Sequence, residues 1–206
     1  MNPILLDPGD YVGTYKLIGG EISLDFVNTI SWPGTAREHD WLDRPGNFIK
    51  WALAINIINQ QKVNQLNAHS QSHLIKELDK VHQVRSNLTN VLKPLAFDAL
   101  PSTAAIEQLN VMAHQICTSR LIDQKSYQWI WNSPMSLTDV LAPVIWNATH
   151  ILTDVAHTRI GYCPSCEWLF YDTTRNRSRR WCDMEDCGSR HKSLNYYRRK
   201  KSVNNS

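Results

Sequence analysis

Apolar residues recur every three or four positions over most of the first 158 residues, which is the spacing of amphipathic helices. Three such stripes are separated by polar or proline-containing segments, and they cover residues 48–58, 74–92 and 106–116. Pro45-Gly46-Asn47 precedes the first stripe and Pro94 ends the second. The pattern therefore predicts three helices that each bury one face.

The most regular apolar stripe begins at Leu137 and continues to Val155. Ser136 and Asp139 just before it have the spacing of a capping box, in which two side chains and two backbone N–H groups pair reciprocally at a helix start. Pro143 interrupts the stripe, and proline has no N–H to donate inside a helix. We therefore expect either a kink at Pro143 or a helix that begins there.

Two segments have the pattern of short β-hairpins. Residues 15–18 and 21–24 flank Gly19-Gly20, a pair that suits a two-residue turn. A second strand pair is expected between Leu121 and Trp131. Together these patterns predict a mainly α fold with minor β-structure (α+β): a helical N-terminal domain with a short β-hairpin (residues 1–158), a small C-terminal unit (159–201) and a disordered tail (202–206).

Length and composition narrow the class of protein. At 206 residues the chain can bury one sizeable core, but the C-terminal unit alone is too small to fold without help. The first residues show no basic leader with an apolar stretch, and no run of about 18 apolar residues occurs. We therefore expect a cytoplasmic protein without a membrane partner, in a compartment where thiols stay reduced.

Four cysteines in the C-terminal unit have the spacing of a metal site. Cys163-x2-Cys166 and Cys182-x4-Cys187 are separated by fifteen residues, enough for a hairpin. Two close-set pairs can place four thiolates at the corners of a tetrahedron around Zn²⁺. Four protein ligands leave no open position, so we expect one structural zinc per chain. Disulfides, a redox-active Cys pair, and a ligand set that includes His191 are the alternatives.

The segments around the cysteines predict a small zinc finger. Residues 168–171 and 179–181 are expected to pair as a hairpin, and a helix is expected from Ser189 onward, with Leu194 and Tyr197 facing the metal. The order of knuckle, hairpin and helix is treble-clef-like.

Charge is distributed unevenly along the chain. Residues 163–201 hold ten Lys or Arg and five acidic residues, a net +5, whereas the remainder of the chain carries −2. A basic module on a faintly acidic body suits a polyanion such as double-stranded DNA. The candidate nucleic-acid contacts are Arg175, Arg177, Arg179, Arg180, Arg190, Lys192, Asn195, Arg198 and Arg199.

Several readings of the basic surface stay open at the level of sequence. It can bind RNA, it can dock an acidic protein partner as an adaptor without nucleic-acid binding, or it can be a solvated face. One finger offers a small footprint on DNA, so we expect a homodimer if the surface binds DNA tightly. No nucleophile elbow, phosphate loop or metal triad with an open position occurs, and we do not expect an enzyme.

A few residues in the helical domain are secondary candidates. Asp25 and Asn28 lie among apolar residues and could either line a ligand-sensing pocket or fix the chain as it enters the bundle; we favour the second. His69 and His73 share a helical face but have no third ligand nearby in the sequence. Cys117 is expected to be a small buried hydrophobe. A small-molecule effector has no supporting motif.

The C-terminal unit resembles the CGNR zinc finger. The stretch Cys163-Pro-Ser-Cys166-Glu-Trp-Leu-Phe-Tyr-Asp172 and the later Arg179-Arg-Trp-Cys-Asp-Met184 carry the resemblance, together with the basic segment after Cys187-Gly-Ser-Arg190. Ser189 stands where that family has Asn. The opening Gly19-Gly-Glu-Ile-Ser-Leu-Asp-Phe-Val-Asn-Thr29 is similar to the ABATE domain, and residues 40–42 and 84–85 fit it more weakly. The resemblance implies a bacterial, stress-induced transcription regulator with a DNA-binding finger.

Overall fold

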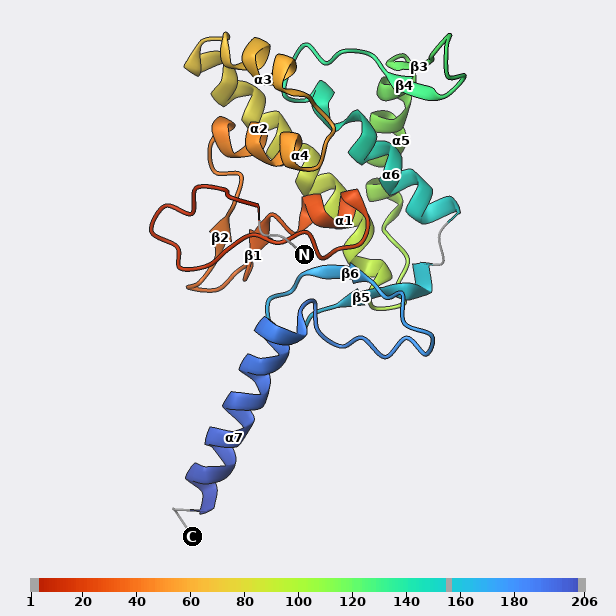
Figure 1. The fold of residues 1–206 in the computed structure, drawn as a ribbon. Helices are drawn as coiled ribbons and strands as arrows, with labels where there is room; N and C mark the ends of the chain where they lie inside the picture. Colours follow the sequence, from red (N-terminus) through yellow and green to blue (C-terminus); the bar gives the residue numbers. More distant parts are fainter. Residues whose placement is uncertain (1–3, 155–156, 204–206) are drawn as a thin grey trace.

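The structure is a computed structural model that describes residues 4–154 and 157–203, without the side chains of 197–199 and 201–203 (Figure 1). The α-helices are α1 (Ile22–Val27), α2 (Pro45–Ala54), α3 (Gln60–Asn67), α4 (Gln71–Leu95), α5 (Thr103–Cys117), α6 (Ala142–Thr153) and α7 (Ser189–Val203). Two 3₁₀ turns, η1 (Asp139–Leu141) and η2 (His157–Arg159), and a π-helical turn, η3 (Met184–Gly188), complete the helical elements. This is the expected α+β class.

Three two-stranded antiparallel sheets accompany the helices. They pair β1 (Ile30–Ser31) with β2 (His39–Asp40), β3 (Arg120–Ile122) with β4 (Trp129–Trp131), and β5 (Ile160–Tyr162) with β6 (Leu169–Tyr171). The pair β3–β4 confirms the strands expected between Leu121 and Trp131. The pair β1–β2 was not predicted, because two residues per strand leave no alternating pattern to detect.

Helix α1 lies at the centre of the molecule (Figure 1). It contacts α4 and α6 on one side and β6 on the other. Its residues 23–27 are all buried, and the large side chains of Trp41, Phe48 and Trp51 in the same core are almost completely enclosed. A single core therefore runs from the helices to the C-terminal hairpin, and it includes the four cysteines of the C-terminal unit.

The predicted helices over residues 48–58, 74–92 and 106–116 are present as α2, α4 and α5, although α2 ends at Ala54. The structure also decides between the two expectations at Pro143. Helix α6 begins at Ala142, so that Pro143 lies in its first turn, where a missing N–H costs no hydrogen bond. Ser136 and Asp139 exchange the two capping bonds, at 3.1 Å and 3.0 Å, ahead of the preceding 3₁₀ turn.

The hairpin predicted over residues 15–24 is wrong. Residues 22–27 form helix α1, and Tyr15 pairs instead with Ile4 in an isolated bridge. The pattern misled because apolar and polar residues alternate from Ile22 to Phe26, as in a strand. Helix α1 is only six residues long and buries Ser23 and Asp25, so it has no polar face to reveal a helical period. Gly19-Gly20 is a bend rather than a hairpin turn, with Gly20 at φ +82°.

The C-terminal unit is built around the hairpin β5–β6, with Cys163 and Cys166 in its turn. The expected pairing of 168–171 with 179–181 is wrong, because β5 occupies that edge of β6 and residues 179–181 form no strand.

Helix α7 directly follows η3 and extends away from the rest of the molecule (Figure 1). It continues to Val203, beyond the expected start of the tail at residue 202; residues 204–206 lie outside the described part. Leu194 is half exposed and so does not face the metal as expected, and the Tyr197 side chain is not described. No helix within the described ranges is long and apolar enough to cross a membrane.

Candidate metal centre and basic helix

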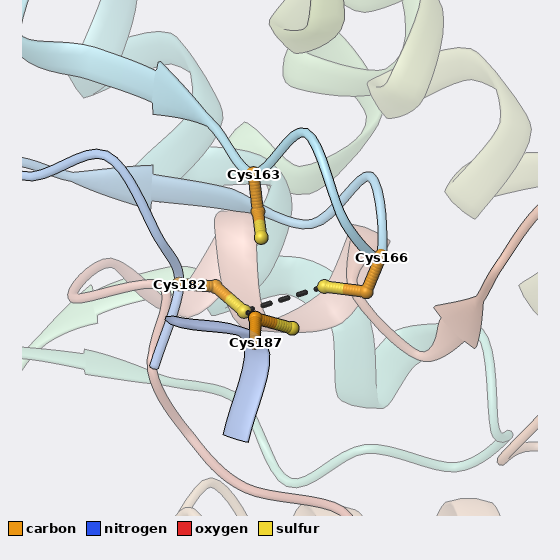
Figure 2. Close-up of side chains that lie close together, drawn as sticks. All are labelled: Cys163, Cys166, Cys182 and Cys187. Atoms are coloured by element: carbon orange, nitrogen blue, oxygen red, sulfur yellow. Dashed lines mark hydrogen bonds between the residues drawn. The ribbon is translucent and has the colours of Figure 1, made fainter. Parts of the chain in front are cut away.

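The four cysteine side chains of the C-terminal unit point into one common space (Figure 2). Their sulfur atoms all lie within 4.8 Å of one another, and the four side chains are buried. The Sγ atoms of Cys166 and Cys182 are 3.3 Å apart and those of Cys182 and Cys187 are 3.6 Å apart. A tetrahedral Zn²⁺ with bonds of about 2.3 Å requires sulfurs about 3.8 Å apart. The donor set and its spacing therefore fit a tetrahedral metal ion.

The charge of the cluster also calls for a cation. A hydrogen bond with Cys166 lowers the pKa of Cys163 far below the usual range of a thiol, whereas the hydrogen bond with Cys163 raises the pKa of Cys182. On their own the thiols thus share protons and cannot all ionise, because several buried anions in contact repel one another. A divalent cation at the centre removes that conflict and holds four thiolates.

Local backbone geometry places each pair of sulfurs. In the first pair, the N–H of Glu167 donates to the carbonyl of Cys163 and the N–H of Cys163 donates to the carbonyl of Trp168, both at 2.9 Å. Glu167 has φ +66°, the left-handed conformation that closes this knuckle. In the second pair, η3 joins Cys182 to Cys187, and the carboxylate of Asp183 caps it by accepting from the N–H of Glu185 at 2.8 Å.

The other sequence-level metal candidates do not join this centre. His191 packs on the ring of Trp181 and hydrogen-bonds Asn195 at 2.8 Å. His69 lies in the bend between α3 and α4 and His73 in the first turn of α4, so they do not share a helical face as expected. Their ring centres are 4.9 Å apart, but the described residues offer them no third ligand. Cys117 is exposed, so the expectation of a buried side chain is wrong; it stands at the last turn of α5, where the helix turns to solvent.

The metal centre is joined to the helical domain through α1. The side chain of Asn28, just after α1, donates to the carbonyl of Leu169 and accepts from its N–H, both at 2.8 Å. The N–H of Tyr171 donates to the carbonyl of Gly19 at 2.7 Å, and the indole of Trp168 donates to the carbonyl of Ile30 at 2.9 Å. Strand β6 is therefore paired with β5 on one edge and bonded to the helical domain on the other.

Arg179 reinforces the same junction. Its guanidinium lies 4.3 Å above the ring of Phe170 and donates to the carbonyls of Ile18 (3.0 Å) and Tyr171 (3.3 Å). It also donates to the carbonyls of Trp181 and Cys182. Because these bonds occupy the guanidinium, we assign Arg179 a structural role and leave it out of the DNA-contacting set.

The other basic candidates lie toward solvent. Arg175, Arg177, Arg180, Arg190 and Lys192 are exposed. Asn195 is partly buried by its bond to His191, and the side chains of Arg198 and Arg199 lie outside the described part, on a stretch of α7 whose backbone is helical. Sequence reasoning did not single out Lys16, which binds the carboxylates of Asp183 and Asp186 at 2.9 Å and 2.6 Å and ties η3 to the N-terminal segment.

Asp25 is a buried carboxyl at this junction rather than part of an open pocket. Its Oδ1 accepts from the N–H of Gly19 at 2.7 Å. Burial raises the pKa of Asp25 to about 6, although the N–H groups of Gly19 and Ile18 favour the charged form. With Asn28 bound to Leu169, both secondary candidates fix the chain, which is the role we favoured from the sequence.

A helical domain that shares one core with a four-cysteine unit, from which a basic helix projects (Figure 1), has the architecture of a zinc-finger protein. Residues 20–155 match the ABATE family, described as "Putative stress-induced transcription regulator", and residues 159–200 match the CGNR zinc finger. The first match covers more than half of the chain, so the chain belongs to this family. A comparison with curated proteins gave no match.

The opening signature of the family has a structural explanation in this chain. A Cβ on Gly19 would lie 2.8 Å from the backbone nitrogen of Asp25, and Gly20 adopts a positive φ against Tyr171. Thr29 accepts a hydrogen bond from Arg85, which also binds Asp40. Residues 19–29 thus fix α1 between the helices and the finger. Asp40 and Arg85 belong to residues 40–42 and 84–85, where the similarity to the ABATE domain is weaker.

Replacing Asn28 with alanine should destabilise the whole molecule. The variant leaves the N–H and carbonyl of buried Leu169 without partners, which should lower the free energy of unfolding by about 2–4 kcal/mol. Urea denaturation of the metal-loaded protein measures this. The control is Asn64→Ala on exposed α3, and an Asn28→Ala protein as stable as that control would contradict the assigned role.

The raised pKa of Asp25 predicts a pH-dependent stability. The folded protein binds more protons than the unfolded chain between about pH 4 and pH 6, so the free energy of unfolding falls as pH rises through this window and stays lower above it. Asp25→Asn keeps an acceptor oxygen and carries no charge. Its stability relative to the wild type should therefore increase from pH 4 to pH 6, by about 2–3 kcal/mol.

Denaturation of both proteins across pH 4–7.5 tests this, because loss of metal in acid affects both alike. A stability difference that does not change with pH would rule out Asp25 as the titrating group.

Proposed function

We propose that this protein is a non-enzymatic, DNA-binding transcription regulator whose finger is held by one structural zinc ion. Helix α7 carries the proposal. It has six Lys or Arg residues and no acidic residue, and it stands clear of the body (Figure 1). A helix with many cations and no acidic residue attracts polyanions, and its Lys and Arg side chains can neutralise phosphates.

The dimensions of α7 suit the major groove of duplex DNA. A 15-residue α-helix is about 22 Å long and fits a groove about 12 Å wide. In this arrangement Arg190, Lys192, Asn195, Arg198 and Arg199 lie along the inserted helix. Arg175, Arg177 and Arg180, in the exposed loop before it, supplement phosphate contacts. A single helix gives a small footprint, so a homodimer on two half-sites is part of the proposal.

The metal is proposed to be zinc and to act structurally. Four thiolates at tetrahedral spacing are the donor set that Zn²⁺ prefers, and they leave no position for a substrate or water. The ion would join β5–β6 to η3 and so hold the first turn of α7 at a fixed angle to the helical domain.

A protein-interaction adaptor is the second candidate function. This function is favoured by Leu194, an apolar residue on α7 that is half exposed. An apolar side chain can be buried against a protein partner, whereas it makes no contact with phosphate groups. In that case α7 would dock on an acidic protein rather than on DNA.

Purified protein should contain one zinc ion per chain. Cys182→Ser removes a central ligand and should abolish stoichiometric zinc and cooperative unfolding, because metal binding of about 10–16 kcal/mol supports such modules. Cys117→Ser, at an exposed site outside the cluster, is the matched control and should keep the metal. Metal analysis and thermal unfolding measure both; metal-free wild-type protein with four freely titratable cluster thiols would refute the zinc assignment.

Binding to a fluorescein-labelled duplex should weaken steeply with salt. If four or five phosphates are neutralised, the slope of log affinity against log salt should be near −4. The double variant Arg198→Ala/Arg199→Ala should reduce the magnitude of this slope by about 2. The control Lys76→Ala/Lys125→Ala removes the same charge from exposed sites of the helical domain and should leave the slope unchanged.

Anisotropy titrations at several NaCl concentrations provide the measurement, and selection from random duplexes then identifies the preferred sequence. A flat salt response would oppose DNA binding. A protein partner lost in the Arg198→Ala/Arg199→Ala variant, with no DNA binding in the wild type, would favour the adaptor.

A further inference from the structure

Two arginines from distant parts of the chain lie over the same indole ring. The guanidinium carbon of Arg37, in the loop between β1 and β2, is 4.1 Å from the ring centre of Trp32. That of Arg190, in the first turn of α7, is 5.1 Å from the same centre. The two carbons are therefore no more than about 9 Å apart, the sum of these distances, and both lie in the range of cation–π contact.

Neither guanidinium has a carboxylate partner among the described residues. Among the acids near them in the sequence, Asp183 and Asp186 bind Lys16, and Glu38 accepts from the N–H of Gly34. Glu185 forms no ion pair with either arginine in the described structure. Arg37 and Arg190 are both exposed and appear in no ion pair or side-chain hydrogen bond of the described structure. Two like charges no more than about 9 Å apart repel each other, and an anion that contacts both guanidinium groups would relieve that repulsion.

Arg37 differs in this respect from the other arginines of the helical domain. Arg44 forms ion pairs with Asp7 and Asp43, and Arg85 with Asp40. Arg120 is enclosed by three tryptophan rings, the nearest 3.9 Å from its guanidinium carbon. Arg37 alone among these four is exposed without a partner in the described residues, so its side chain is available to a ligand.

The ring that carries the two arginines is fixed to the metal centre. The N–H of Trp32 donates to the carbonyl of Cys166 at 3.4 Å, and its indole N–H donates to the hydroxyl of Tyr11 at 3.2 Å. Trp32 has φ +56°, a conformation that a bulky residue adopts only where its surroundings impose it. The loop of the helical domain and the root of α7 are therefore held in one fixed arrangement.

We infer that Arg37, Trp32 and Arg190 form a phosphate-binding site through which the helical domain grips the DNA backbone beside α7. This inference rests on the proposed function. Planar guanidinium groups bind phosphate oxygens in pairs of hydrogen bonds, and stacking on an indole orients them beforehand. The site lies at the base of the inserted helix, where the backbone bordering the groove would pass, and it supplies a contact that the finger alone lacks.

The test compares three charge-removing changes on the zinc-loaded, full-length protein, with a labelled mixed-sequence duplex as the probe. Arg37→Ala should reduce the magnitude of the salt slope by about 0.9, which corresponds to about eightfold weaker binding at 0.1 M salt if affinities converge near 1 M. Lys125→Ala is the matched control and should have no effect; this exposed residue lies between β3 and β4, a strand pair at the opposite end of the molecule from α7 (Figure 1). Arg198→Ala/Arg199→Ala tests α7 itself.

A fourth variant excludes a merely structural effect. Arg37→Lys keeps the charge and should restore most of the slope while losing part of the affinity, because lysine offers no planar pair of donors. Zinc content and circular dichroism verify that each variant folds.

The outcomes separate the two proposals. If the α7 variant loses binding and Arg37→Ala behaves like Lys125→Ala, the phosphate site is refuted and the DNA-binding function stands. If the wild type shows no salt-dependent DNA binding at all, both are refuted. A slope reduced by Arg37→Ala and recovered by Arg37→Lys supports the site.

Discussion

The position of the metal centre depends on the edge of strand β6. Asn28 exchanges two hydrogen bonds with Leu169, and Gly19 accepts one from Tyr171, so the outer edge of β6 is bonded to the residues that flank α1. Because α1 is itself buried among α4 and α6, the hairpin cannot turn relative to the helices without breaking buried bonds. The finger is thus part of the core of the molecule, and its cysteines and β6 residues are packed in the same buried cluster as the helices.

This attachment gives α7 its direction. A 15-residue helix with six cations and no acidic residue would be marginal in isolation, since short helices are costly to nucleate and like charges along them repel. Its first turn is continuous with η3, which holds Cys187 and is capped by Asp183, and Asp183 in turn binds Lys16. The first turn of α7 is therefore connected both to the cysteine cluster, through Cys187, and to the N-terminal segment, through Lys16.

The sequence was sufficient where local spacing determines structure. The helical stripes of α2, α4 and α5 have the apolar period, the Cys-x2-Cys and Cys-x4-Cys pairs place their sulfurs within short turns, and Ser136 and Asp139 lie one helical turn apart. The sequence was insufficient where the hydrogen-bond partner of a residue lies far away along the chain. Asn28 meets Leu169 across 141 residues, and Arg179 meets Ile18 across 161, so neither bond could be read from its neighbours.

The same distinction explains the two wrong strands. Apolar and polar residues alternate from Ile22 to Phe26, which is the period of a strand, but α1 is a helix that buries the polar Ser23 and Asp25 together with Leu24 and Phe26. Residues 179–181 were expected to return as a strand because a polar, turn-like segment precedes them. In the structure β6 pairs with β5 instead, which only the tertiary arrangement decides. Arg179, read as a surface cation, is directed inward by the same arrangement.

A rigid joint has a consequence for recognition if the protein binds DNA as proposed. In a dimer of such molecules, the separation and relative angle of the two α7 helices would be set by the interface between helical domains and not averaged by linkers. Half-site spacing would then be as specific a requirement as base sequence. A change anywhere along the α6–α1–β6 stack, such as at the Asn147 side chain that holds Ser23 and Glu21 of the α1 entry, would alter that angle rather than the chemistry of the finger.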